Sequence, residues 1–533
     1  MRRKRLGNLN KRMWKFLGLR KWGRRKLAPR VFKTAANSSI CHAADVTGVP
    51  PRLLDQFRKL AAKTVKCKGG GASKTIALHV APVRRLDPAY AACVGPIKRW
   101  ASRAWRATDA ITLKMQKVWL ADISRMAPAL IAEDQKAIWN QVGGGCSALL
   151  ATLARIGWKS RSAFCWTTHR GRSIDLRSDP PALVAELADG AVEDWLWRGV
   201  AHRHDCLREL ASGASTEVLR RLVACSPRQG WGPLQQGTLA CAASGGLWSQ
   251  DRLCRAGLSE VSMCEACGLS LGTIKHRVYH CPLLEPWRRQ ALSEEVLALA
   301  KAAEDDHPLW CRGVLPRAML PVVPAFTPCR QVVWTRRGDG TQTLEGDVFT
   351  DGSVTNPDIK ELSAGGWAVA QLTHTNGANL QCVVLFHGQV PYEEVDSTTC
   401  EIYALYMALC HMAGFVRIHI DNDETINGVR QGECYCLSPS NKYAHVWRLV
   451  WGKIRDVGGV SWEEAFALVS VKSHTTQADQ DAGRVSALHR VGNGWADKFA
   501  KLEAQRAAPP PAVVTEFRHW LGVQKEVCMW LGT

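Results

Sequence analysis

Two groups of residues in this sequence have the types and spacing needed for metal chemistry. The first group is four acidic residues in the last third of the chain: Asp351 within Thr-Asp-Gly-Ser, then Glu401, Asp421 and Asp497. Carboxylate oxygens are the ligands that Mg²⁺ prefers, and two such ions about 4 Å apart stabilise both the attacking and the leaving oxygen in phosphodiester hydrolysis. The four acids are therefore candidates for a two-metal site.

The second group reads Cys-Glu-Ala-Cys from Cys264 to Cys267, followed after eight residues by His276 and after four more by Cys281. Two thiolates on a tight turn, with an imidazole and a third thiolate from a short helix, complete a tetrahedral Zn²⁺ site. His280 is a competing ligand. Four protein ligands leave no position for water, so the expected zinc is structural.

The elements expected around the acids alternate between strands and helices. Asp351 follows the apolar pair Val348 and Phe349, and we expect it at the exposed end of that strand. Glu401 is expected in the first turn of a helix over 397–413, capped by Ser397 or Thr398. The other expected elements are strands at Gly366–Leu372, Cys382–Phe386, 415–421 (ending in Asp421) and Phe466–Val471, and helices at 443–456 and 492–504, the last carrying Asp497.

This β-β-β-α-β-α-β-α order, with the acids at these places, resembles ribonuclease H type 1 over about residues 345–505. The resemblance implies an α/β fold with a mixed five-stranded sheet, flanking helices, and hydrolysis of the RNA strand of RNA–DNA hybrids. It implies that Asp351 contacts both Mg²⁺ ions, with Mn²⁺ as an alternative metal. Glu401 and Asp421 would hold the ion near the leaving group, and Asp497 the ion near the water.

The resemblance also implies a mobile histidine after the last strand and residues that contact the hybrid. His474, in Lys-Ser-His, has the expected place, but 22 residues separate it from Asp497, so His489 is an alternative. Ser353 and Asn493 are the candidates for contacting the hybrid, which differs from duplex DNA in its 2′-hydroxyls and its A-like minor groove.

Charge divides the 533 residues, whose formal net charge is +22, into unlike parts. Residues 1–33 hold 14 basic and no acidic side chains, whereas residues 334–533 hold 17 basic and 23 acidic ones, a charge of −6. We therefore expect the basic N-terminal two thirds to bind a nucleic-acid backbone. The expected divisions are a basic arm (1–45), a mostly helical region (46–250), a zinc segment (251–305), a Pro-rich linker (306–343), the ribonuclease H-like domain (344–507) and a C-terminal tail (508–533).

The zinc segment followed by this nuclease resembles the C-terminal half of a non-LTR retrotransposon polyprotein. No aromatic-x-Asp-Asp turn of a polymerase is present, so we expect a truncated product without DNA synthesis. No run approaches 18 apolar residues, and the scattered cysteines favour a reducing, intracellular location, with nuclear residence implied by the basic arm and the resemblance. Two alternatives are a non-catalytic nucleic-acid-binding relic and a zinc-stabilised structural adaptor.

Overall fold

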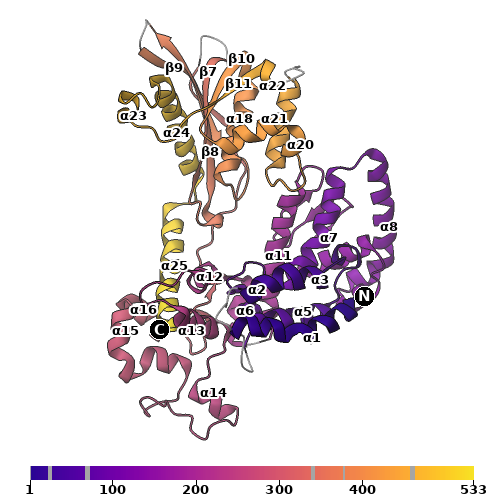
Figure 1. The fold of residues 1–533 in the computed structure, drawn as a ribbon, viewed down its shortest axis with the longest axis vertical. Helices are drawn as coiled ribbons and strands as arrows, with labels where there is room; N and C mark the ends of the chain where they lie inside the picture. The colour runs from indigo at the N-terminus through magenta and orange to yellow at the C-terminus, as the bar shows by residue number, and fades with distance from the viewer. Residues whose placement is uncertain are drawn as a thin grey trace. The chain divides into compact units, whose positions relative to one another are not determined.

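The computed structural model describes residues 2–21, 27–65, 72–203, 205–337, 343–375, 379–456 and 462–533. The chain forms two compact units (Figure 1). The first comprises Met1–Pro321 and Glu516–Thr533, and the second comprises Val322–Thr515. The boundary at residues 321 and 322 lies inside the expected linker over 306–343. The second unit is thus an insertion in the chain of the first.

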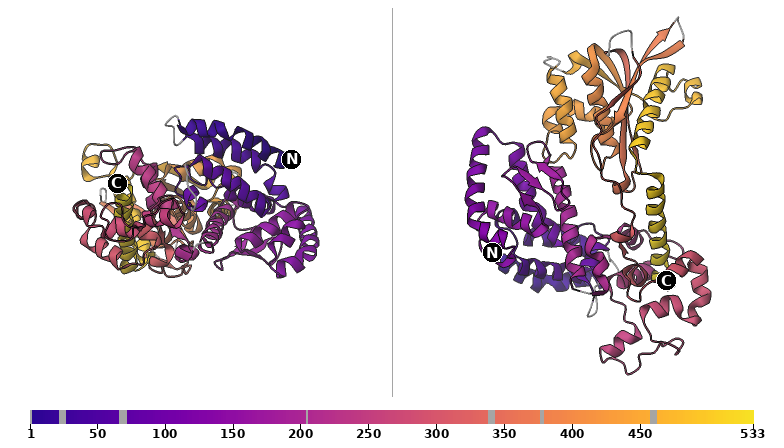
Figure 2. Two further views of the ribbon diagram at one scale, coloured as in Figure 1. Left: turned by 90° about the horizontal axis from the view of Figure 1, so that it is seen from below. Right: turned by 180° about the vertical axis from the view of Figure 1, so that it is seen from behind.

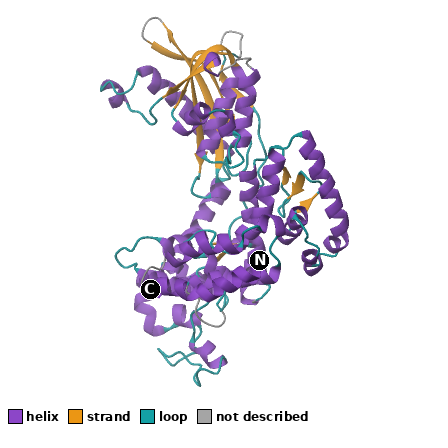
Figure 3. Ribbon diagram, turned by 45° about the vertical axis from the view of Figure 1, so that its right-hand side comes forward, coloured by secondary structure: helices purple, strands orange, loops and turns teal. Residues whose placement is uncertain are grey.

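The first unit is mostly helical, with two small groups of strands (Figure 3). Its helices are α1 (Arg2–Lys21), α2 (Leu27–Val31), α3 (Ser38–Ile40), α4 (Ala44–Thr47), α5 (Pro51–Thr64), α6 (Lys74–His79), α7 (Pro88–Trp105), α8 (Asp109–Ile131), α9 (Gln135–Asn140), α10 (Gly145–Ile156), α11 (Pro181–Ala201), α12 (Glu217–Ala224), α13 (Pro233–Ser244), α14 (Gln250–Arg255), α15 (Glu285–Ala291), α16 (Glu294–Ala302) and α17 (Pro308–Arg312). Strands β1 (Lys159–Ser160), β2 (Cys165–Thr167) and β3 (Ser173–Asp175) form one sheet, and β4 (Ala214–Ser215) pairs with β5 (Leu315–Pro316).

Local signals and one buried ion pair explain the start of α7. Asp87 caps the helix, accepting a hydrogen bond from the Ala89 amide at 2.9 Å, and Pro88 occupies the first turn, where no amide donor is needed. The same carboxylate receives the Arg58 guanidinium of α5 at 2.8 Å, and both side chains are buried. The cap therefore also connects α5 with α7.

Both ends of the chain enter the first unit more fully than the expected arm and tail suggest. In α1, Met13 is buried, and Phe16 lies edge-on to Phe32 at 5.9 Å; Met1 and residues 22–26 of the arm fall outside the described residues. Residues expected as a tail form α25 (Pro511–Gly532), where Val527 and Cys528 are buried with the side chains of the first unit. These burials give the two terminal segments apolar contacts that a solvated arm or tail lacks.

The second unit is built on a six-stranded mixed sheet, in the order β11-β10-β7-β8-β9-β6 (Figure 1). β7, β8 and β9 are antiparallel neighbours, whereas β10 runs parallel to both β7 and β11. The strands are β6 (Val332–Arg336), β7 (Leu344–Thr355), β8 (Ala364–Thr375), β9 (Asn379–Gln389), β10 (Met412–Ile420) and β11 (Phe466–Ser470). The helices are α18 (Ser397–His411), α19 (Asp423–Gln431), α20 (Glu433–Cys436), α21 (Ala444–Asp456), α22 (Trp462–Ala465), α23 (Gln477–Asp481) and α24 (Ala487–Ala507).

Helices cover both faces of this sheet, with α18 and α21 on one face and α24 on the other (Figures 1 and 2). Successive residues of β7 alternate between the two faces: Val348 belongs to the core under α18, and Phe349 to the core under α24. Gly366 of β8 permits the approach of α24, because a Cβ there would lie 2.3 Å from the Ala500 carbonyl oxygen. The α/β class and a mixed sheet agree with the sequence-based expectation.

The sheet has six strands, and not the expected five, because β6 adds to the edge formed by β9. This strand lies within residues assigned to the linker. Its Val332-Val333-Trp334 run has a high strand propensity, and Trp334 stacks on Phe386 of β9 at 4.5 Å. Among the described residues, no helix combines the length and apolar character required to cross a bilayer.

Candidate active site and metal centres

The parallel pairing of β7 with β10 brings two of the four acids together. Ile420 is in register with Thr350, so Asp421, the next residue after β10, comes beside Asp351. The expectation that Asp351 ends its strand is wrong. Pairing with β8 continues β7 as far as Thr355, so Asp351 lies within the sheet and is only 6% exposed.

The third acid, Glu401, reaches the same place from α18. Asp396 caps this helix by accepting a hydrogen bond from the Thr399 amide at 3.0 Å, so the cap is not Ser397 or Thr398, and Glu401 lies in the second turn. A Cβ on Gly352 would lie 2.2 Å from the Glu401 amide nitrogen. The absence of a side chain at Gly352 therefore lets the start of α18 contact β7, which places Glu401 against Asp351.

Asp351, Glu401 and Asp421 form a carboxylate cluster whose ligand oxygens all lie within 4.8 Å of one another. Burial, followed by repulsion from Asp421 and Asp497, raises the pKa of Asp351 to about 7. Burial and the charge of Asp351 also raise the pKa of Glu401 well above its usual value. The Glu401 Oε2 atom is buried without a hydrogen-bond partner. A group of hard oxygens with an unpaired buried acceptor suits a divalent cation such as Mg²⁺.

The fourth acid, Asp497 of α24, lies outside this cluster. Its carboxylate pairs with Lys501, one turn later on the helix, at 2.7 Å. Its charge nevertheless contributes to the raised pKa values of Asp351 and Asp421, which shows that it is near enough to repel them. The structure thus brings three of the four predicted acids into one cluster, with the fourth close by.

The two residues predicted to contact the hybrid have different surroundings. Asn493 is 5% exposed, and its Nδ2 donates to the Asp421 Oδ2 at 3.2 Å, while its Oδ1 is buried without a hydrogen-bond partner. Asn493 therefore orients a carboxylate of the cluster. Ser353 is half-buried in β7, two residues after Asp351 and on the same face of the sheet.

The two candidate histidines also differ in position. His474 is exposed in the segment between β11 and α23, has a φ of 50°, and is near enough to Asp421 to offset part of the rise that burial causes in the pKa of that carboxyl. His489 lies in the first turn of α24, where its ring is 5.0 Å from that of His419 and 6.5 Å from that of Phe349. His474 therefore lies near a carboxylate of the cluster, whereas His489 packs against rings of the sheet.

A polar network beside the cluster was not predicted from the sequence. Asp347 of β7 receives the Arg417 guanidinium of β10 through two hydrogen bonds of 2.7 and 2.6 Å, and its Oδ1 lies 2.9 Å from the His419 Nε2. The hydrogen bonds from Arg417 are the main cause of the low pKa of Asp347, about 2. These contacts hold the register of β7 and β10 four residues before Asp351. Predicting these contacts from the sequence would require knowing that two strands some 70 residues apart pair with each other, which residue types alone do not reveal.

The predicted zinc ligands meet in the first unit. Donor atoms of Cys264, Cys267, His276 and Cys281 lie within 4.8 Å of one another, and the His276 Nε2 is 3.3 Å from the Cys267 Sγ. His280, the competing ligand, is exposed and is not part of this group. Although burial opposes ionisation, hydrogen bonds from the Cys267 and Ala266 amides lower the pKa of Cys264. Three thiols and one imidazole are a donor set that suits Zn²⁺.

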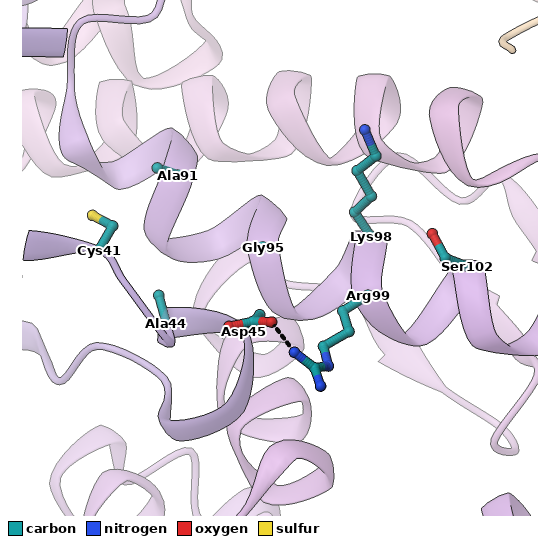
Figure 4. A pocket seen from close by; sticks show the side chains of 8 residues that line it. All are labelled: Cys41, Ala44, Asp45, Ala91, Gly95, Lys98, Arg99 and Ser102. Atoms are coloured by element: carbon teal, nitrogen blue, oxygen red, sulfur yellow. Dashed lines mark hydrogen bonds and ion pairs between the residues drawn. The ribbon is translucent and has the colours of Figure 1, made fainter. Parts of the chain in front are cut away.

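A shallow pocket of about 380 Å³ lies between α4 and α7 in the first unit (Figure 4). Its lining residues are Cys41, Ala44, Asp45, Ala91, Gly95, Lys98, Arg99 and Ser102. Arg99 is paired with Asp45, and the lining contains no aromatic ring on which a base could stack. We assign no catalytic role to this pocket.

Comparison with known proteins found similar solved structures, whereas no protein-family model and no curated protein matches. The prototype foamy virus protease–reverse transcriptase is 18% identical, with 30% of this chain and 20% of that chain covered and a TM-score of 0.24. The solution structure of the ribonuclease H domain of that virus is 18% identical over 31% of this chain and 96% of that chain, with a TM-score of 0.24. A foamy viral protease–reverse transcriptase in complex with double-stranded DNA is 13% identical over 29% of this chain and 92% of that chain, with a TM-score of 0.21.

The carboxylate cluster predicts that the stability of the metal-free chain falls as the pH rises and that a bound metal ion opposes this fall. Because folding raises the pKa of Asp351 to about 7, the folded chain binds more protons than the unfolded chain between about pH 4 and pH 7. Without metal, the melting temperature should therefore fall as the pH rises from 5 to 8. At pH 8, Mg²⁺ should raise it by more than at pH 5, by roughly 2–4 °C per kcal/mol of stabilisation.

Thermal unfolding followed by circular dichroism, with Mg²⁺ or with EDTA, measures these shifts. An Asp351→Asn chain, which lacks one buried negative charge, should melt higher than the parent at pH 8 in EDTA and respond less to Mg²⁺. Equal Mg²⁺ shifts for both chains would contradict metal binding by this cluster.

The cysteine–histidine cluster predicts one bound zinc ion per chain. A Cys281→Ser chain should lose the ion and unfold more easily, because the remaining three ligands hold zinc less tightly. Zinc released to a colorimetric chelator measures the content. Cys434→Ser, which changes an exposed cysteine of the other unit, serves as the matched control and should retain zinc. Zinc in the Cys281→Ser chain at the parental level would contradict the assignment.

Proposed function

We propose that this chain is a metal-dependent endoribonuclease that hydrolyses the RNA strand of RNA–DNA hybrids. The observation that carries the proposal is the carboxylate cluster of Asp351, Glu401 and Asp421, with a buried unpaired oxygen, on a sheet whose element order resembles ribonuclease H. Buried carboxylates that repel one another reduce stability unless a cation joins them, so their convergence favours a catalytic purpose.

Each residue of the cluster would have a separate part in the reaction. Two bound Mg²⁺ ions would supply the activated water and neutralise the departing 3′ oxygen. The charges of both Asp421 and Asp497 act on Asp351, so Asp351 is near both carboxylates and would hold the ions together with them. Asn493 would hold the Asp421 carboxylate in its orientation through their 3.2 Å hydrogen bond. In-line attack on the phosphorus would leave a 5′-phosphate and a 3′-hydroxyl.

His474 would move a proton at the cluster or assist product release. It is exposed, it is near enough to influence Asp421, and it follows the last strand of the sheet. An exposed imidazole near the carboxylates can exchange protons with solvent, which the buried acids do less readily.

The basic N-terminal two thirds would hold the nucleic acid. Residues 1–333 carry 53 basic and 25 acidic side chains, a net charge of +28, whereas the nuclease unit supplies mainly acids. Ser353, on the face of the sheet that carries Asp351, would contact the hybrid beside the scissile bond. Phosphate contacts made by this basic region would give binding a strong salt dependence without sequence preference.

A second candidate function is nucleic-acid binding without cleavage, as expected of a decayed retroelement protein. The observation that favours it is the position of Asp497, whose carboxylate pairs with Lys501 outside the cluster. If Asp497 cannot leave Lys501, the ion near the attacking water lacks its ligand. Both functions predict that the chain binds nucleic acid, but only the first predicts that it cleaves the RNA strand of a hybrid.

An Asp351→Asn variant tests the nuclease directly. Removal of a carboxylate that would hold the ions should reduce cleavage of a labelled RNA–DNA hybrid by at least about a hundredfold in Mg²⁺ while binding is retained. Glu345→Gln changes an exposed acid on the same strand and is the matched control, with unchanged cleavage expected. If the parent chain binds the hybrid but does not cut it, the non-catalytic alternative is correct.

The role of His474 can be separated from that of His489 by single substitutions. We expect His474→Ala to slow cleavage by roughly tenfold or more, because a proton-transfer group is lost. His489→Ala removes only a ring packed against the sheet, so its effect on cleavage should be smaller. Rates measured from pH 6 to 9 for both variants would check this. A larger loss in the His489→Ala chain would reverse the assignment.

A further inference from the structure

The zinc segment contains a short ribbon in which one β-bridge joins two extended stretches of the chain. Met263 and Leu271 are paired across it, and the Cys264 amide donates to the Ser270 carbonyl oxygen at 2.7 Å. Because side chains alternate between the faces of an extended chain, Cys264 and Met263 point in opposite directions. Cys264 is buried with the other metal ligands, so Met263 and Leu271 belong to the outer face.

Exposed apolar side chains are concentrated in this part of the segment. Five aliphatic side chains within 14 residues are exposed, and we call them the apolar ribbon face: Leu258 (68%), Val261 (56%), Met263 (38%), Leu269 (72%) and Leu271 (52%). Single exposed apolar residues are ordinary on protein surfaces, but a concentration of this kind marks a surface that another molecule covers.

The charge around the apolar ribbon face is acidic, in contrast to the rest of the first unit. Residues 256–272 contain two charged side chains, Glu260 and Glu265, and no lysine or arginine. Both glutamates are exposed, and Arg255, just before this stretch, is paired with Asp251. Phosphate groups would be repelled here, and the stretch holds no aromatic ring on which a base could stack. Nucleic acid is therefore a poor occupant of this surface.

We propose that the apolar ribbon face binds a basic amphipathic helix of a partner protein. The exposed leucine, valine and methionine side chains can contact the apolar stripe of an amphipathic helix, which lies against a partner surface by its apolar side. Lysine or arginine residues beside that stripe meet Glu260 and Glu265. The zinc segment would thus recruit a protein, a role beyond the proposed cleavage of RNA–DNA hybrids.

A defined peptide tests this proposal with the full-length protein. The probe is a fluorescently labelled 14-residue peptide of leucine and lysine with one apolar helical face, and its control is a scrambled peptide of the same composition. We expect the amphipathic peptide to bind at least tenfold more tightly than the scrambled one, as measured by fluorescence anisotropy. A Leu269→Ser/Leu271→Ser chain should lose at least tenfold in affinity.

Two further variants separate the contributions of charge and of general surface hydrophobicity. Glu260→Lys/Glu265→Lys should weaken binding of the amphipathic peptide and reduce its dependence on salt. Leu283→Ser changes a leucine that is 55% exposed but lies outside the apolar ribbon face, and it should leave the affinity unchanged. Zinc content and far-ultraviolet circular dichroism establish that each variant is folded.

Three outcomes would overturn the proposal. The first is equal binding of both peptides, or binding unchanged by Leu269→Ser/Leu271→Ser. The second is a tenfold loss of hybrid affinity in that variant with peptide binding retained, which would make the surface a nucleic-acid site. The third is a concentration-dependent dimer that the same variant abolishes, which would identify a second copy as the occupant. Peptide binding does not require cleavage, so these outcomes are independent of the proposed nuclease.

Discussion

The second unit depends on holding three carboxylates together where burial and like charge both oppose it. The unfavourable electrostatic free energy of this arrangement appears in the raised pKa values of Asp351 and Glu401. Contacts between neighbouring elements hold the carboxylates in place. The Asp347–Arg417 ion pair holds β7 and β10 in register, and Gly352 lets α18 approach β7 closely. Without that register Asp421 would not lie beside Asp351, and without that approach Glu401 would not reach them. The position of α18 on the sheet is therefore tied to the carboxylate cluster.

Residue types were enough to predict most of the order of elements and the three acids that meet, because each acid accompanies a local pattern of strand or helix. They were not enough where the answer depends on pairing between distant segments. Asp351 was expected at a strand end, but pairing with β8 extends β7 past it. The cap at Asp396 and the added strand β6 were missed for related reasons, since a cap one residue upstream and an edge partner leave weak local signals. Asn493 was predicted to contact the hybrid, and its bond to Asp421 depends on the packing of α24.

The two candidate metal sites use different donor atoms and lie in different units of the chain. The first unit holds the sulfur and nitrogen donors, and the second unit holds the carboxylate oxygens. Thiols and an imidazole meet within 17 consecutive residues after Cys264, so their spacing alone predicted the cluster. The carboxylates come from segments spread over 70 residues and required a fold to assemble them. The net charge of +22 conceals a similar separation, because an acidic stretch around the apolar ribbon face interrupts a basic region. Local composition therefore describes the surfaces of this protein better than its total charge.

The second unit is entered after Pro321 and left before Glu516, so it is attached to the first unit at both of its ends. A domain joined by a single linker is released by one proteolytic cut, whereas this one remains tethered by the other crossing unless both are severed. Attachment at both ends also limits how far the second unit can move from the first. The effective concentration of the second unit near any ligand of the first unit would therefore be high. The topology thus keeps the two units joined after a single break in the chain.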